Sequence, residues 1–166
     1  MGVTGTSDLK RLIGRVTALR SPAWRAGLAK NLAQEAQSQI LQGFQAQRDP
    51  YGRPWKPSGR AISQGGQTLS NTARLRRSFS SPSAVSRADD RGFVVGTNVL
   101  YAEVHQRGMK IEAKTSRGLR FNSGGRWYTK QSVTIPQRMM IPEGPLGPIW
   151  DVAFRQAAEA YFRRSV

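Results

Sequence analysis

Few residues in this chain could move protons, attack a substrate or hold a metal. There is one histidine, His105, and no cysteine. A serine–histidine–acid triad would therefore need His105, and no serine lies in a nucleophile-elbow motif. His105 follows Tyr101 by four residues, the spacing of neighbours on one face of a helix, so a packing role is favoured over catalysis. The sequence predicts no catalytic residue and no enzyme activity.

Motifs for metals and phosphates are equally scarce. The adjacent carboxylates Asp89 and Asp90 fall in a predicted hairpin turn, where aspartate is expected for turn geometry alone. The glycine pairs 65–66 and 124–125 are not followed by the Lys-Ser/Thr of a P-loop. We therefore predict no metal site and no cofactor.

Positive charge is the strongest chemical signal, because 26 Lys and Arg against 10 Asp and Glu give a net charge of +16. Such a surplus repels itself and favours an anionic partner: nucleic acid, an acidic protein surface or a pore that carries DNA. Two tracts, residues 51–82 and 113–138, contain cations and no acid, and within them we predict two basic loops at about residues 51–68 and 114–131. A generally basic, solvated exterior is the alternative reading.

The residues predicted to contact a partner or DNA come from these tracts. Aromatic side chains among the cations, at Trp55 and at residues 127–128, could stack on bases while the cations meet phosphates. No zinc-finger spacing or recognition-helix pair accompanies them, so any contact with DNA should be to the backbone and independent of sequence. The predicted contact residues are Arg53, Trp55, Lys56, Arg60, Arg74, Arg76, Arg77, Lys114, Arg117, Arg120, Arg126 and Lys130.

The elements that must position these residues begin with two helices. Ser7 can cap the first, whose apolar residues at 9, 12, 13, 16 and 19 recur at helical spacing. Ser21 followed by Pro22 begins the second, and its apolar stripe steps every fourth residue from Trp24 to Phe44. That stripe is expected to cover the chain's own core, and a slanted contact with a partner is the alternative. The helix must end before the turn residues 49–52.

The middle of the chain changes to strand patterns. Residues 53–67 show no periodicity and few apolar anchors, so we expect an irregular loop that partners order. Ser70 should cap a short helix that runs to residue 77, and Asn98 one at 99–107 that ends at a left-handed Gly108. Strand patterns occur at 84–87 and 93–97 around a turn at 89–92, at 109–113, around a turn at 122–125, and at 133–141, where Pro136 allows only an edge position.

The whole pattern predicts one α+β domain over residues 1–166. It has N-terminal helices, a central and mostly antiparallel sheet with a short helix, and a C-terminal helix that begins at Pro148. No stretch approaches the length of about 18 apolar residues that a membrane helix needs, so we predict no membrane partner. The absence of cysteine suits a reducing cytoplasm.

Three segments, taken in order, resemble the phage virion-morphogenesis family, which includes Mu-like morphogenesis proteins and tail-completion proteins. The first is FQAQRDPYGRPWKP at 44–57. The second is the Leu-Ser-x-Thr-x-x-Leu-x-x-Ser-Phe pattern at 69–79. The third is VVGTNVLYAEVHQRG at 94–108, similar to the family's Val-Gly-Thr-Asn, Tyr-Ala and His-Gln-x-Gly. A later Ile-Pro-Gln-Arg at 135–138 is similar to Ile-Pro-Ala-Arg-Pro-Phe, but Met139 and Met140 replace the proline and the aromatic residue.

The resemblance covers residues 32–141 and implies a non-enzymatic structural protein at the head–tail junction of a tailed phage, acting in the neck or in tail completion. It implies a virion location after assembly in the host cytoplasm. The implied partners are other neck, connector and tail proteins, copies of itself in a homo-oligomeric ring, and DNA without sequence preference. No catalytic residues come with it. The alternative function is a free, sequence-independent nucleic-acid-binding basic protein.

Overall fold

The computed structural model describes residues 5–19, 21–80, 84–123 and 125–165. Its longest element is α2 (Pro22–Ala46), and local chemistry fixes both ends of that helix. The Ser21 hydroxyl accepts a hydrogen bond from the Trp24 N–H at 3.2 Å, and proline occupies the first turn, which confirms the predicted start. The helix ends at Gln47, which has a left-handed φ of 54°.

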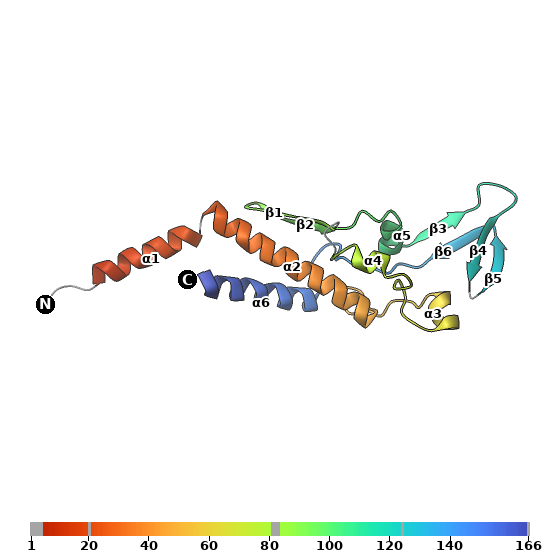
Figure 1. The fold of residues 1–166 in the computed structure, drawn as a ribbon, viewed down its shortest axis with the longest axis horizontal. Coiled ribbons are helices and arrows are strands. Elements are labelled where there is room, and N and C mark those ends of the chain that lie inside the picture. The colour runs from red at the N-terminus through yellow and green to blue at the C-terminus, as the bar shows by residue number, and fades with distance from the viewer. Residues whose placement is uncertain (1–4, 20, 81–83, 124, 166) are drawn as a thin grey trace.

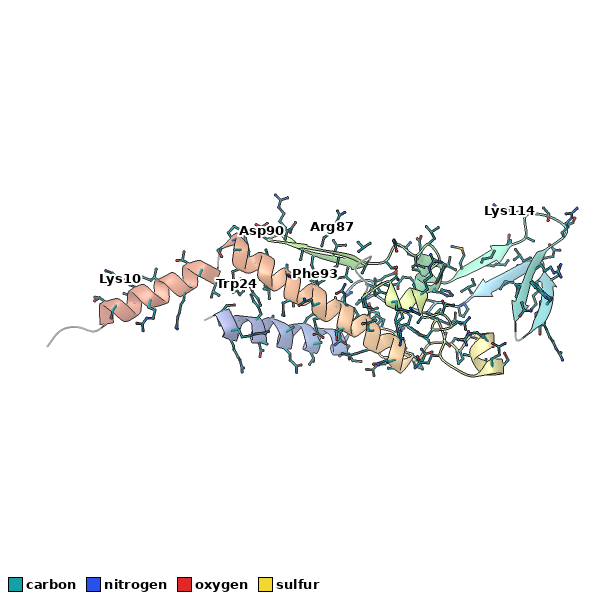
Figure 2. All side chains as sticks on the ribbon, in the orientation of Figure 1. Lys10, Trp24, Arg87, Asp90, Phe93 and Lys114 are labelled. Atoms are coloured by element: carbon teal, nitrogen blue, oxygen red, sulfur yellow. The ribbon has the colours of Figure 1, made fainter. Side chains whose placement is uncertain are left out.

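Two elements pack along α2 (Figure 1). The C-terminal helix α6 (Pro148–Ser165) lies beside it, and the hairpin of β1 (Val85–Asp89) and β2 (Gly92–Gly96) lies on another side. Gly27 lets α6 approach closely, because a β-carbon at that position would collide with the Tyr161 hydroxyl. At the hairpin turn, Arg25 of α2 pairs with Asp90 at 3.1 Å. Figure 2 shows Asp90 near the end of α2 that carries Trp24.

The described strands form three separate two-stranded antiparallel sheets. They are β1–β2, β3–β6 and β4–β5, where β3 is Met109–Glu112, β4 is Leu119–Ser123, β5 is Arg126–Lys130 and β6 is Ser132–Ile135. The predicted α+β class with antiparallel pairing is confirmed. β6 ends directly before Pro136, so it is shorter than the predicted strand, because proline offers no N–H to a ladder.

Three short helices depart from the predictions. The helix α3 (Gly59–Gln64) lies inside the segment predicted to be irregular, and the Ser58 hydroxyl caps it by accepting from the Ala61 N–H. The helix α4 (Arg74–Arg77) begins after Ala73, so the predicted cap at Ser70 is wrong. The predicted cap at Asn98 is also wrong: α5 (Ala102–Arg107) begins later and has no side-chain cap.

The core lies where the second half of α2 meets the loops and α6. Phe44, Phe79 and Ile40 are the largest fully buried side chains. Burying a side chain of this size stabilises the fold by about 1.5–3 kcal/mol. The α2 stripe therefore covers the chain's own core, as expected. The buried hydrophobic residues packed together are Ala36, Ile40, Phe44, Trp55, Leu75, Phe79, Val99, Ala102, Met140 and Trp150.

The helix α1 (Gly5–Leu19) projects from one end of this body, and the β4–β5 hairpin lies at the other end (Figure 1). The side chains of Leu9, Ile13 and Val16 are 55%, 56% and 51% exposed. These three side chains of the apolar stripe predicted for the first helix are therefore left about half exposed by the described part of the chain. None of the described helices is both long enough and apolar enough to cross a membrane.

Candidate contact surfaces

Five of the predicted contact residues lie together in one projecting unit, which we call the basic ribbon (residues 114–123 and 125–130). Lys114 and Arg117 lie in the loop before β4, and both are exposed. Arg120, Arg126 and Lys130 lie on the β4–β5 hairpin and are exposed as well. In Figure 2, Lys114 lies at the end of the molecule opposite Lys10 of α1. There is no acidic residue in this stretch of sequence.

One face of the hairpin carries Arg120 and Trp127. Arg120 is paired in register with Thr129, and Asn122 with Trp127, so the arginine and the tryptophan are diagonal neighbours on the same face. The guanidinium carbon lies 4.8 Å from the centre of the Trp127 ring, within the range of a cation–π contact. The Trp127 side chain is nevertheless 63% exposed, so most of the ring remains available to a partner.

The other face combines the same chemistry with different residues. Phe121 and Tyr128 are register partners whose ring centres lie 5.9 Å apart in a stacked arrangement. Arg126 and Lys130 belong to this face because they alternate with Tyr128 along β5. Both faces of the ribbon therefore present cations beside aromatic rings.

Short hydrogen bonds hold the loop that carries Lys114 and Arg117. The Ala113 N–H donates to the Gln131 carbonyl at 2.8 Å, and the Gln131 amide donates to the Ser116 carbonyl at 3.1 Å. Gly118, with φ of 77°, lies against Thr129 and Lys130. This loop is thus tied to the base of the ribbon.

Trp55 is a correction to the prediction, because it is a core residue and only 6% exposed. Its ring packs edge-on against Phe44 at 5.3 Å, and its indole N–H donates to the Met139 carbonyl at 3.0 Å. Its backbone N–H donates to the Gln47 carbonyl at 2.7 Å. It cannot stack on a base in this fold. Arg53 and Lys56 on either side of it are exposed.

The rest of the first basic loop has few apolar anchors, as predicted, since Ile62 is 75% exposed, but hydrogen bonds within the chain hold it. The Ser58 N–H donates to the hydroxyl of Thr68, which is buried. Arg60, a predicted contact residue, directs its guanidinium at the Gly65 and Gln67 carbonyls at 3.4 and 2.6 Å. That side chain closes its own loop.

The three arginines of α4 differ in exposure. Arg74 is exposed, whereas Arg76 is half-buried. The Arg77 guanidinium donates to the Thr72 carbonyl at 2.8 Å, although the side chain remains exposed. Of the three, Arg74 is the one most available to a partner.

Arg138, the last cation of the second tract, is buried and structural. It is 5% exposed, and its Nε donates to the Lys56 carbonyl at 2.8 Å. Its backbone N–H donates to the His105 carbonyl at 2.6 Å. Burial and the nearby Arg138 charge both lower the pKa of His105, and burial lowers the pKa of Arg138. His105 packs edge-on against Tyr101 at 6.1 Å, as predicted.

Gln106 is a structural residue that the sequence analysis missed. Its amide oxygen accepts from the Met140 and Ile141 N–H groups at 2.8 and 3.2 Å. Its amide nitrogen donates to the Ile141 carbonyl at 2.7 Å and to Glu143 at 3.3 Å. Its position in the His-Gln-x-Gly pattern is the sequence feature that could have indicated this structural role. In the described part of the chain, no group of three or more His, Asp or Glu side chains could hold a metal ion.

Comparison with known proteins gives one positive finding. No curated protein and no solved structure matches the chain. The model of the phage virion morphogenesis family matches residues 5–145, which extends beyond the motif-bearing segments on both sides. Since this match spans most of the sequence, the chain belongs to the phage virion morphogenesis family.

Proposed function

We propose that this protein is a structural component of the head–tail junction of a tailed phage, added when the neck or the tail end is completed. The observation that carries the proposal is the match of residues 5–145 to the phage virion morphogenesis family. Membership of that family indicates a role in the assembly of phage particles. The chemistry of the chain agrees with a role exerted through contacts, because several of its exposed cations lie together on the basic ribbon.

The shape of the molecule supports an assembly role. A packed body carries α1 at one end and the basic ribbon at the other (Figure 1). The α1 stripe leaves apolar side chains about half exposed, and exposed apolar surface of this kind is typical of interaction sites. The proposed partners are other neck, connector and tail proteins and further copies of the chain in a ring. The protein would be made in the host cytoplasm and end in the virion neck or tail end.

Removal of the gene from its phage tests the proposal. We expect DNA-filled heads and separate tails in electron micrographs of the lysate, and joined particles when the gene is restored from a plasmid. Purified wild-type virions should contain the protein at the neck when it carries an epitope tag. Virions that lack the protein, or normal joining without the gene, would overturn the proposal.

The second candidate is a free, sequence-independent nucleic-acid-binding protein, and the net charge of +16 favours it. In that role the protein would be found on DNA in the infected cell and not in purified virions. Particles would also join normally without it. The same lysate and virion preparations therefore separate the two functions.

A further inference from the structure

We infer that the basic ribbon inserts into a groove of double-stranded DNA and holds the phosphate backbone without reading its sequence. The inference assigns DNA as the partner of one surface of the proposed junction protein. It rests on the proposed function only for where in the phage particle the protein would meet DNA. The binding itself is a property of the purified chain.

Charge gives the first step of the argument. Lys114, Arg117, Arg120, Arg126 and Lys130 are exposed, and no acid lies between residues 113 and 138. No described ion pair uses any of these five side chains. Cations without a carboxylate partner can release counterions from phosphates when they bind, which is the main source of sequence-independent affinity for DNA.

The distribution of charge over two faces gives the second step. Arg120 lies on one face of the hairpin, and Arg126 and Lys130 lie on the other. A flat acidic protein surface could meet only one of these faces at a time. A DNA groove has phosphates along both walls, and the major groove is wide enough to admit a two-stranded β-ribbon. The ribbon therefore fits duplex DNA better than it fits an acidic protein.

Aromatic stacking gives the third step. An isolated two-stranded hairpin is marginally stable in water, and no other described element packs extensively on β4 or β5. The Arg120–Trp127 contact on one face and the Phe121–Tyr128 stack on the other hold the hairpin together from both sides. Less ordering is then needed when it binds, and the cations are already spaced along the strands.

Fluorescence anisotropy of a short labelled duplex of mixed sequence, titrated with the purified full-length protein, tests the inference. The variant Arg120→Gln/Arg126→Gln/Lys130→Gln should bind at least about tenfold more weakly, and its log–log salt slope should fall by about three, one for each lost phosphate contact. The matched control Lys30→Gln/Arg87→Gln/Arg91→Gln removes the same charge from exposed positions on α2, β1 and the turn after β1. We expect it to change binding by less than about threefold.

Two further measurements test whether the positive charge and the DNA backbone account for binding. The double variant Arg120→Lys/Arg126→Lys retains the charge and should bind within about threefold of wild type, which would show that the positive charge at these positions carries the binding. Polyglutamate should displace the duplex poorly, and a second duplex of unrelated sequence should bind equally well.

Equal losses in the ribbon variant and the control would overturn the inference, because binding would then follow net charge alone. Strong competition by polyglutamate would also overturn it and make an acidic protein the partner. These outcomes concern the ribbon only. Absence of the protein from virions would instead contradict the proposed function and leave DNA binding intact.

Discussion

Gln106 shows how much of this fold depends on single polar side chains. Its amide joins α5 to the segment after β6 through four hydrogen bonds, three of them to backbone groups of residues 140 and 141. The core residue Met140 belongs to that segment. One side chain thus keeps a loop without regular structure in place over the core.

Gln106→Ala should therefore destabilise the protein by about 1–3 kcal/mol, the cost of leaving part-buried backbone groups without partners. Glu103→Ala on the same helix is the control, because Glu103 is highly exposed and makes only a long ion pair with Arg107. That control should cost less than about 0.5 kcal/mol. Urea unfolding of the two variants measures the difference, and equal midpoints would show that Gln106 is dispensable.

Gly108 ends α5 with a positive φ, as predicted, although its ψ of 154° places it outside the left-handed helical region. A β-carbon there would lie 2.8 Å from the Gln137 nitrogen and 3.1 Å from the Ile135 oxygen. Gly65 has nearly the same backbone angles, with φ of 74° and ψ of −178°, and nothing within 4 Å of the added carbon. A comparison of alanine substitutions at Gly108 and Gly65 therefore separates the cost of backbone strain from the cost of a steric collision.

Gly108→Ala should cost more than Gly65→Ala by about 1–3 kcal/mol, since both variants strain the backbone but only one pushes against a neighbouring chain segment. Thermal unfolding of both variants checks this. A larger loss for Gly65→Ala would mean that the contacts around Gly108 yield easily.

His105 predicts a pH dependence of stability. Because burial and Arg138 lower its pKa below the ordinary 6.5, the unfolded chain takes up a proton at a higher pH than the folded chain does. The stability that the folded chain gains from a neutral His105 is fully present above pH 6.5 and is lost as the pH falls through the lowered pKa. Melting temperatures should decline from pH 7 toward pH 5.5, and His105→Gln should decline less. An identical decline in the variant would assign the effect to other groups.

At the scale of elements, α1 is a weakly attached helix. Its apolar residues at 9, 13 and 16 remain half exposed, and it meets α2 only near its end. Burial of apolar area is what stabilises a docked helix, so α1 adds little to the fold of the body.

Deletion of residues 1–20 should therefore change the free energy of unfolding by about 1 kcal/mol or less. The circular dichroism signal should fall by the share of one helix, while the unfolding midpoint in urea stays close to that of the full chain. A large shift in the midpoint would mean that α1 folds back on the body in solution.

Two element ends that depend on neighbouring residues were predicted correctly from the sequence. Ser21 caps α2 within its own first turn, and the Asp89 carboxylate accepts from the Arg91 and Gly92 N–H groups to make the β1–β2 turn. Both interactions join residues that lie within three positions of each other, so the local pattern contains the information.

Features set by distant residues were not predictable in this way. Trp55 is buried because its indole meets a carbonyl 84 positions further along the chain, and Arg138 because it meets a carbonyl 82 positions back. Both were counted with the exposed basic tracts. The cations of the ribbon are exposed, as expected, because no other described element packs extensively on this hairpin.

For the whole molecule, charge should control association. A ring of subunits that each carry +16 brings like charges together, and at about 0.1 M salt those charges act over roughly 10 Å. We expect the pure protein to be monomeric or loosely associated at low salt, and to form rings only on an anionic surface. Light scattering of the pure protein measures this; a stable ring in dilute buffer would show that apolar faces drive assembly instead.

The two projecting ends also offer sites where a protease can cut. Trypsin-like enzymes cleave after lysine and arginine in segments that can unfold locally, and α1 and the basic ribbon supply such residues while Arg138 in the core does not. A free subunit offers both ends to proteolysis, whereas a subunit held by neighbours at both ends does not. Surplus copies would then be cleared in the host and incorporated copies spared, so the number that survive would follow the number of particles built.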